Sequence, residues 1–408
     1  MSRQKGEFAM KVLCTCLPGY GHFHPLMILA TGAAERGHDV AFATAKDFCP
    51  HIEEMGFAAY PAGISLEAQL ERANATIPEA ALPPGRERFE SFVPQMLAGV
   101  AAPPRAEDLA PILAAWQPDL LVHEETEMGG PLAAAGAGIP WATQSVGILR
   151  PLAMARLAGR TVAPLADRLG VDVGPMAGLA RYLYLDVCPP RLQNEEIGQI
   201  PVAHPMRNVR LETESNETAA PGDLPPWVAE MDPARPTVYI SLGTIFNHEP
   251  EVFSIILAGL APLPLNLIVT LGPGTDPASF GPQPDHVHVE AFIDQEVLLP
   301  HCDVVVNQGG TAILAILAHG LPLLVLPQGA NQFNNAEACV AAGVGRRLLR
   351  PEMDPDTVRR EVILLLEDPQ WTERARSVAQ EIAAMPGPIE GVALLERLAA
   401  ERAPLVAP

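Results

Sequence analysis

Residues 301–339 read HCDVVVNQGGTAILAILAHGLPLLVLPQGANQFNNAEAC, and this stretch indicates the fold class. A short apolar strand at 304–306 leads into the turn 307–311 and an apolar helix, which Gly320 and Pro322 end. A second buried strand at 323–326 is followed by a polar loop at 327–335. The pattern predicts a βαβ unit of a parallel sheet, with polar turns at the carboxyl ends of its strands.

The two polar turns favour a ligand that carries both phosphate and hydroxyl groups. The free amides and dipole of a helix N-terminus bind phosphate. Asn331 and Gln332, one βα unit later, are placed to bind hydroxyls. Phosphate and hydroxyls together describe a sugar nucleotide. Taken alone, this window is explained equally well by an ordinary βαβ unit with polar surface loops.

The same alternation of strand and helix occurs on both sides of a linker. We expect strands at 10–17, 38–44, 57–59, 119–122 and 140–144, then at 237–241, 265–271 and 287–291, with helices between them. This order predicts two doubly wound parallel sheets. Residues 65–105 lack periodicity and are expected to be irregular, whereas 150–200 are mixed and partly helical.

Residues 204–236 contain ETESNETAAPGDLPPW, which is rich in acids and Pro and lacks periodicity, as linkers do. We therefore expect four parts. They are an N-terminal domain at 1–215, a linker at 216–235, a C-terminal domain at 236–385, and a final helix at 386–408 that packs back on the N-terminal domain.

Composition excludes several classes of partner. The 408-residue chain has 27 basic and 48 acidic residues, a formal net charge of −21, which argues against nucleic acid and anionic membranes. The sequence shows neither a membrane span nor a signal peptide, so we expect a cytoplasmic, soluble protein. Its six scattered cysteines are interpreted as buried thiols rather than as a zinc or redox motif.

Five motifs occur in an order that is typical of one family. They are PGYGHFHP at 18–25, PDLLVHEETEMGGPLAAA at 118–135, SLGT at 241–244, FIDQEVLLPHCDVVV at 292–306, and GG followed by PQGANQF at 327–333. Over essentially its whole length the chain resembles GT-B glycosyltransferases of bacterial secondary metabolism. The resemblance implies two Rossmann-like domains facing a cleft, the N-terminal one binding the acceptor and the C-terminal one binding the nucleotide-sugar.

By this resemblance His22 is the catalytic base and Glu124 the acid that orients it. A histidine suits the role because its ordinary pKa lies near neutrality. His24 is the competing base, although it matches a variable family position. Glu125 or Glu127 could replace Glu124. Alternatively, the three acids form a solvated helix start without a catalytic role.

The resemblance also implies a set of donor-binding residues in the second half. Phe292 would lie under the base, Ile293 would read the base edge through its backbone, and Gln295 would lie beside the ribose. The remaining positions are Gly243 and Thr244 near the nucleotide, Gln308, Gly309, Gly310 and Thr311 at the phosphate turn, and Asn331 and Gln332 at the sugar loop.

The phosphate turn and the sugar loop both depart from the family pattern. The phosphate turn of the family is His-Gly-Gly-x-Gly-Thr, whereas here Gln308 replaces the histidine and Ala312 and Ile313 end the turn. Gln308 can still donate a hydrogen bond but carries no charge. Asn331 replaces a carboxylate, which weakens a charge-assisted hydrogen bond. The change fits a deoxysugar donor and fits a decayed donor site equally well.

The leading hypothesis is an inverting, metal-independent glycosyltransferase without a cofactor. It would move a (deoxy)hexose from a dTDP- or UDP-sugar to a small, largely apolar natural-product acceptor, with a homodimer as the candidate assembly. A non-catalytic sugar-nucleotide-binding auxiliary protein is the first alternative, because the phosphate turn is altered. A sugar-nucleotide epimerase or hydrolase of the same fold is the second.

Overall fold

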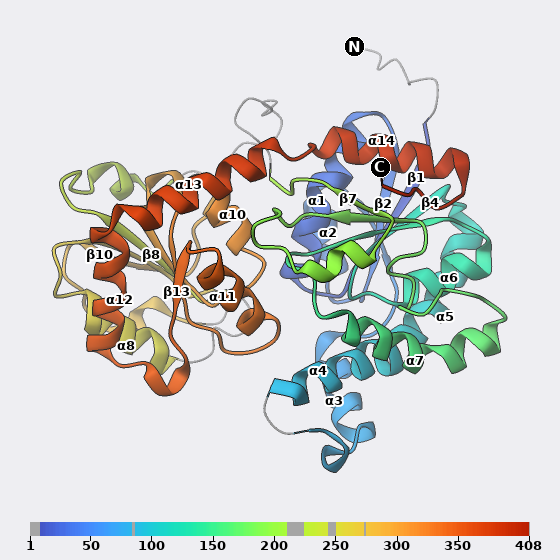
Figure 1. Cartoon of the computed structure of the whole chain (residues 1–408), viewed down its shortest axis with the longest axis horizontal. Coiled ribbons are helices and arrows are strands. Elements are labelled where there is room, and N and C mark those ends of the chain that lie inside the picture. The colour runs from blue at the N-terminus through green and yellow to red at the C-terminus, as the bar shows by residue number, and fades with distance from the viewer. Residues whose placement is uncertain (1–8, 84–85, 210–223, 244–249, 273–274, 408) are drawn as a thin grey trace. The chain divides into compact units, whose positions relative to one another are not determined.

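The computed structural model describes residues 9–83, 86–209, 224–243, 250–272 and 275–407. The chain forms two compact units (Figure 1). The first unit comprises residues 1–188, 193–210 and 385–408, and the second comprises 189–192 and 211–384. Each unit is built on a parallel sheet, so the predicted α/β class is confirmed.

The first unit contains a seven-stranded parallel sheet in the order β3-β2-β1-β4-β5-β6-β7. Its strands are β1 Lys11–Thr15, β2 Asp39–Thr44, β3 Ala58–Pro61, β4 Leu120–Glu124, β5 Trp141–Gln144, β6 Leu183–Asp186 and β7 Ala203–Pro205. The chain leaves β1 toward one edge and returns to form β4 on the other side of it. The loops after β1 and β4 therefore diverge at this point, which is where open α/β sheets bind ligands.

Helices flank this sheet, and the last of them lies next to the first. They are α1 Tyr20–Glu35, α2 Cys49–Glu54, α3 Leu66–Thr76, α4 Arg86–Gln95, α5 Ala102–Trp116, α6 Gly129–Ala137, α7 Leu152–Leu169 and α14 Pro388–Glu401. Helix α14 packs against α1 (Figure 1), and Glu396 binds the Arg36 guanidinium at 2.8 Å and His38 Nε2 at 3.0 Å. The C-terminal helix thus belongs to the N-terminal unit.

The expectation of irregular structure at 65–105 is wrong. This segment contains α3, α4, a π-helical turn at Met96–Ala101 and the beginning of α5. Ser65 caps α3 by accepting a hydrogen bond from Ala68 N. The buried face of these helices is narrow. Ala73, Met96 and Leu97 form a small cluster with Leu17, so the apolar repeat in the sequence is weak.

The second unit contains a six-stranded parallel sheet in the order β10-β9-β8-β11-β12-β13. Its strands are β8 Thr237–Ser241, β9 Asn266–Thr270, β10 Val287–Glu290, β11 Val304–Asn307, β12 Leu323–Val325 and β13 Gly345–Arg347. Its helices are α8 Pro250–Leu260, α9 Gln295–Leu298, α10 Ile313–Ala318, α11 Gln332–Ala341, α12 Pro355–Glu367 and α13 Pro369–Ala384. Here the direction of winding changes between β8 and β11.

Burial agrees with the predicted apolar strands. Every residue of β4, β9, β11 and β12 is buried, as expected for central strands covered by helices on both faces. All six cysteines lie in the described part of the chain as buried thiols. Among the described helices, none is long and apolar enough to cross a membrane.

Candidate active site

His22 lies in the first turn of α1, directly after the loop that follows β1. Its backbone N–H donates to Gly19 O at 3.1 Å, which fixes the start of the helix beside the end of β4. Strands β1 and β4 pair in parallel, with Thr15 opposite His123. The loop and helix start that follow β1 therefore meet the last residue of β4 at the switch point of the sheet. The His22 side chain remains 24% exposed, so a ligand can reach it.

Glu124, the last residue of β4, lies against His22 and is fully buried. Its Oε1 is 3.2 Å from His22 Nδ1 and accepts a hydrogen bond from Leu17 N at 3.3 Å. Its Oε2 accepts from Thr126 N at 2.8 Å, and Thr126 Oγ1 lies 2.7 Å from both oxygens. A buried carboxylate is tolerated because each of its oxygens has donors. The predicted pairing of Glu124 with His22 is present in the structure.

Electrostatics keeps this carboxylate ionised. Burial by itself raises the pKa of Glu124, but the charge of His22 and hydrogen bonds from His22 and Thr126 outweigh it and lower the pKa to about 2. An ionised Glu124 accepts a hydrogen bond, so it favours the tautomer in which His22 Nδ1 carries the proton. The lone pair of Nε2 then remains on the other side of the ring, where a base needs it.

Two other histidines near this point differ from His22. His123 is buried, its Nδ1 lies 2.7 Å from Glu127 O, and its Nε2 lies 2.7 Å from Thr143 Oγ1. Burial lowers the pKa of His123, so it is a neutral structural residue. His24 is exposed and its ring packs near Tyr20. Further ring contacts of His24 are with Phe23 and His51, at centroid distances of 5.7 and 6.1 Å.

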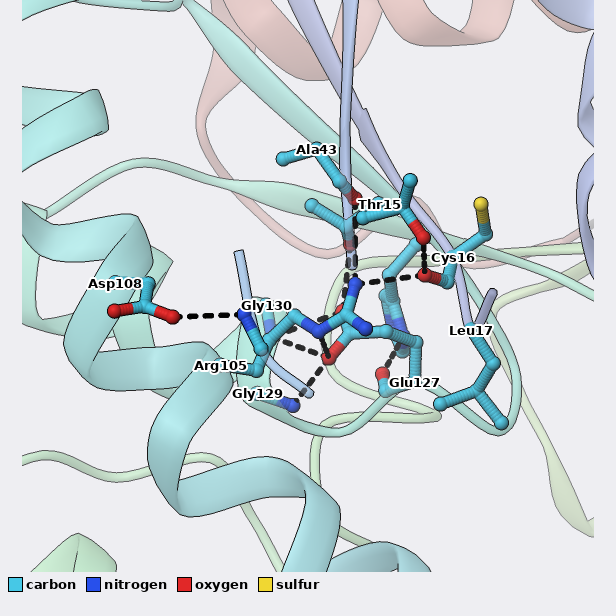
Figure 2. A network of polar contacts seen from close by, with 12 residues as sticks. Thr15, Cys16, Leu17, Ala43, Arg105, Asp108, Glu127, Gly129 and Gly130 are labelled. Carbon is cyan, nitrogen blue, oxygen red and sulfur yellow. Dashed lines mark hydrogen bonds and ion pairs between the residues drawn. The ribbon is translucent and has the colours of Figure 1, made fainter. Parts of the chain in front are cut away.

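Glu127 stabilises the backbone around the site (Figure 2). It accepts hydrogen bonds from Gly129 N at 2.6 Å and Gly130 N at 3.0 Å, at the start of α6, and from Thr15 Oγ1 at 2.6 Å. The buried Arg105 lies 3.9 Å from it and donates to Cys16 O at 2.7 Å. This pair joins α5 and α6 to the loop after β1. The carboxylate of Glu127 therefore binds backbone amides, Thr15 and Arg105, and it does not pair with His22.

Glu125 has partners other than His22. Its Oε2 accepts from Tyr184 Oη at 3.1 Å, and its Oε1 lies 3.6 Å from Arg150 Nη1. The side chain is buried. All three acids are thus buried with different partners, and the alternative of a solvated helix start is wrong.

Asp186, at the end of β6, is a further buried acid, and its raised pKa can be tested by the pH dependence of stability. Burial raises its pKa to about 6, although Gln193 Nε2 and Cys188 N donate to Oδ1. The folded state disfavours the ionised form, so this group lowers stability as pH rises from about 4 through about 6. Asp186→Asn keeps an oxygen for both donors. We expect it to stabilise the protein by about 1–3 kcal/mol at about pH 8.

Urea denaturation of the wild type and Asp186→Asn at about pH 4.5 and about pH 8 measures this effect. The difference in free energy of unfolding should be small at the lower pH, where the native aspartate is protonated. An equal difference at both pH values would contradict the assignment of the titrating group.

In the second unit, Gly243 and Gln308 meet where β8 and β11 end. Gly243 has φ +77°, a conformation that favours glycine, and a Cβ built there would clash with the side-chain amide of Gln308. Gln308 is buried, and its Oε1 has no hydrogen-bond partner. A buried amide oxygen without a protein partner is unusual and is able to accept a hydrogen bond from a ligand. Thr244, the neighbouring predicted residue, lies outside the described residues.

The loop after β12 contains a residue that sequence reasoning missed. The two polar side-chain atoms of Gln328 are buried without a hydrogen-bond partner. Gln332 is buried and its Oε1 accepts from Gln328 N and Gly329 N, so Gln332 shapes this loop. Asn331 is the N-cap residue of α11 and makes no capping hydrogen bond through its side chain. The side chain of Gln332 is therefore committed to the loop, whereas the side-chain polar atoms of Gln328 have no protein partner.

The two polar turns lie against each other. A Cβ built at Gly309, which has φ +87°, would lie 3.2 Å from Gln332 O, and Gly309 O accepts from Asn335 Nδ2 at 2.8 Å. Gly310 and Thr311 follow and are partly exposed. The helix after them, α10, has six residues, which is shorter than the sequence suggested.

Residues 292–294 belong to the loop between β10 and α9, and Gln295 is the first residue of α9. Phe292 is 78% exposed, so it is not a core residue and its ring is available for stacking. The side chain of Ile293 is buried, and Gln295 Nε2 is buried without a partner.

The PQGANQF motif was the only sequence signal for Gln328. Thr126 lies within the motif at 118–135, but it was not predicted as a site residue, although it contacts both His22 and Glu124.

Comparison with known proteins shows a match over both halves of the chain. Residues 33–243 match the family model "Erythromycin biosynthesis protein CIII-like, N-terminal domain". Residues 254–398 match the corresponding C-terminal domain model. The first match extends through β8, the first strand of the second sheet, and the second match begins within α8.

Similar proteins cover nearly the full length of the chain. L-demethylnoviosyl transferase of Streptomyces niveus is 30% identical over 96% of this chain and 98% of its own. Aclacinomycin-T 2-deoxy-L-fucose transferase of Streptomyces galilaeus is 26% identical over 96% and 97%. The crystal structure of the glycosyltransferase SnogD from Streptomyces nogalater is 28% identical, covers 96% of this chain and 100% of its own, and superposes with a TM-score of 0.74.

Proposed function

Because the chain belongs to the glycosyltransferase family of erythromycin biosynthesis protein CIII-like proteins, we propose that it glycosylates a small, largely apolar natural product. The donor is a dTDP- or UDP-deoxyhexose, and the anomeric configuration inverts. His22 acts as the base and Glu124 orients it. The pairing of these two residues at the switch point of the first sheet is the observation that carries the proposal.

The reaction is a single displacement at the anomeric carbon. His22 Nε2 removes the proton of an acceptor hydroxyl while the oxygen forms a bond to the anomeric carbon. The bond from that carbon to the diphosphate oxygen breaks, and the nucleoside diphosphate leaves with the electron pair. Attack on the face opposite the leaving group inverts the configuration. Glu124 stabilises the imidazolium until His22 returns the proton to water.

Several features of the second unit support a sugar-nucleotide donor. Phe292 offers an exposed ring for a base, and Gln308, Gln328 and Gln295 carry buried amide atoms without partners. A bound diphosphate and sugar would satisfy such atoms. The relatives named after a noviosyl or 2-deoxy-L-fucose group support a deoxysugar. Asn331, an amide in place of the family's carboxylate, agrees with a sugar that has fewer hydroxyls.

The acceptor binds in the first unit, close to His22. A pocket lined by Leu97, Met128, Leu152, Met154, Met176 and Leu179 also includes Thr126. Thr126 Oγ1 is 3.2 Å from His22 Nδ1, so the pocket begins beside the base. Its apolar lining supports an apolar acceptor.

Calorimetric titration with dTDP and UDP tests the donor site. We expect one diphosphate to bind and Phe292→Ala to weaken it by about 10-fold or more, because base–aromatic stacking contributes about 1–3 kcal/mol. Leu364→Ala is the matched control, since Leu364 is also an exposed apolar residue of the second unit. This variant should bind the nucleotide as the wild type does.

Failure of the folded wild type to bind either diphosphate would contradict the proposal. Binding of a diphosphate without transfer to any member of an acceptor panel would favour the auxiliary function. Gln308, which replaces the histidine of the family's phosphate turn, is the observation behind this alternative. Release of nucleoside diphosphate from the donor without an acceptor would favour hydrolysis.

A further inference from the structure

The pocket beside His22 is apolar except at one place. Its lining is mainly Leu and Met side chains of α7, the π-helical turn and neighbouring loops, and Glu125 and Arg150 provide the charged groups. The cavity volume is about 40 Å³, which is room for a few water molecules or for one polar end of a larger ligand. Removing a charged pair from water in such lining costs free energy, which makes its presence there notable.

Glu125 is incompletely satisfied in this pocket. The residue is 5% exposed, and its Oε1 has no hydrogen-bond partner. Arg150 Nη1 lies 3.6 Å from that oxygen, which is close enough for charge attraction but too long for a hydrogen bond. The other oxygen, Oε2, is held by Tyr184 Oη at 3.1 Å. Tyr184 thus fixes the carboxyl group and leaves one oxygen to accept a hydrogen bond.

Glu125 does not serve the proposed proton transfer. His22 is paired with Glu124, and Glu127 is occupied by the start of α6. Thr126 lies between the proposed base and the pocket, because its side chain contacts Glu124 and His22 and also lines the pocket. A larger ligand whose polar end enters the pocket would therefore lie against Glu125 and, beside Thr126, close to His22.

We propose that Glu125 is a specificity-determining residue, which selects acceptors that carry a hydroxyl or amine donating a hydrogen bond to its Oε1. This donor is distinct from the hydroxyl that receives the sugar. Arg150 supports the carboxylate, and the Leu and Met side chains hold the apolar part of the acceptor. The inference rests on the proposed function, because the pocket is an acceptor site only if the protein transfers a sugar. A site built to bind a donor rejects analogues that lack it, because its polar atom then stays unpaired.

Binding of two aromatic probes tests the inference without turnover. The fluorescence of 2-naphthol, which has a hydroxyl, and of naphthalene, which has none, is titrated against the full chain. We expect 2-naphthol to bind about 10-fold more tightly or better, because a hydrogen bond to a charged group is strong. Glu125→Gln should reduce this preference, and Glu125→Met, which removes both acceptor oxygens, should abolish it.

Met154→Leu is the matched control, because it changes apolar lining and should alter the binding of both probes by the same factor. Equal binding of 2-naphthol and naphthalene to the wild type would overturn the inference, and so would binding of neither. The comparison of 2-naphthol with naphthalene on the wild type tests the inference even if Glu125→Met fails to fold. Selective binding of 2-naphthol by a protein that binds neither dTDP nor UDP would support this inference and overturn the proposed function instead.

Discussion

His22→Ala should lower the kcat of glycosyl transfer by about 10²- to 10⁴-fold, which is the range that a general base contributes. The substitution removes the group that accepts the acceptor's proton. It leaves the carboxylate of Glu124 with its hydrogen bonds from Leu17 N and Thr126 N. Because His22 is partly exposed and lies at the start of a helix, the fold should remain intact. Initial rates with saturating donor measure the effect.

His24→Ala is the matched control for this substitution. His24 lies two residues further along the same helix and is exposed, and its ring contacts are with aromatic neighbours. We expect its kcat to stay close to that of the wild type. If His24→Ala were inactive and His22→Ala active, the assignment of the base would be wrong. Binding of the nucleoside diphosphate should be the same in both variants, which separates loss of chemistry from loss of the donor site.

The parallel sheets could be predicted because their strands are short apolar segments between helices and Gly- or Pro-containing turns. Strand β11, for example, is three valines and an asparagine, all buried. Helices α3 and α4 could not be predicted in this way. Few of their residues are buried, so packing leaves little trace in the periodicity, and local signals such as the Ser65 cap carry the information instead.

The site was only partly predictable, because its partners are distant in sequence. The three acids at 124–127 are indistinguishable as a local pattern. In the structure Glu124 meets His22, Glu125 meets Tyr184, and Glu127 meets Arg105. Only the fold of the sheet brings each pair together. A resemblance to a family identified His22 and Glu124, whereas Gln328 became a candidate only when its buried atoms were found without partners.

The second large effect is expected for Glu124→Gln, which should lower kcat by about 10²-fold or more, as in related acid–histidine pairs. The ionised carboxylate accepts a hydrogen bond from the ring and favours a proton on Nδ1. An amide can present its NH₂ group to the ring instead. Nδ1 would then accept a hydrogen bond, the proton would move to Nε2, and the lone pair needed to accept the acceptor's proton would be lost.

The same substitution should destabilise the first unit by about 1–3 kcal/mol, because it leaves a buried donor unpaired. In the wild type each oxygen of Glu124 accepts one backbone N–H, Leu17 N on Oε1 and Thr126 N on Oε2. A glutamine has one oxygen and can serve only one of them. Urea denaturation at neutral pH measures this loss beside the kinetics. Glu53→Gln is the control, since it removes one exposed acid from the same unit. Unchanged stability and rate in Glu124→Gln would show that Glu124 neither orients His22 nor holds the two backbone amides.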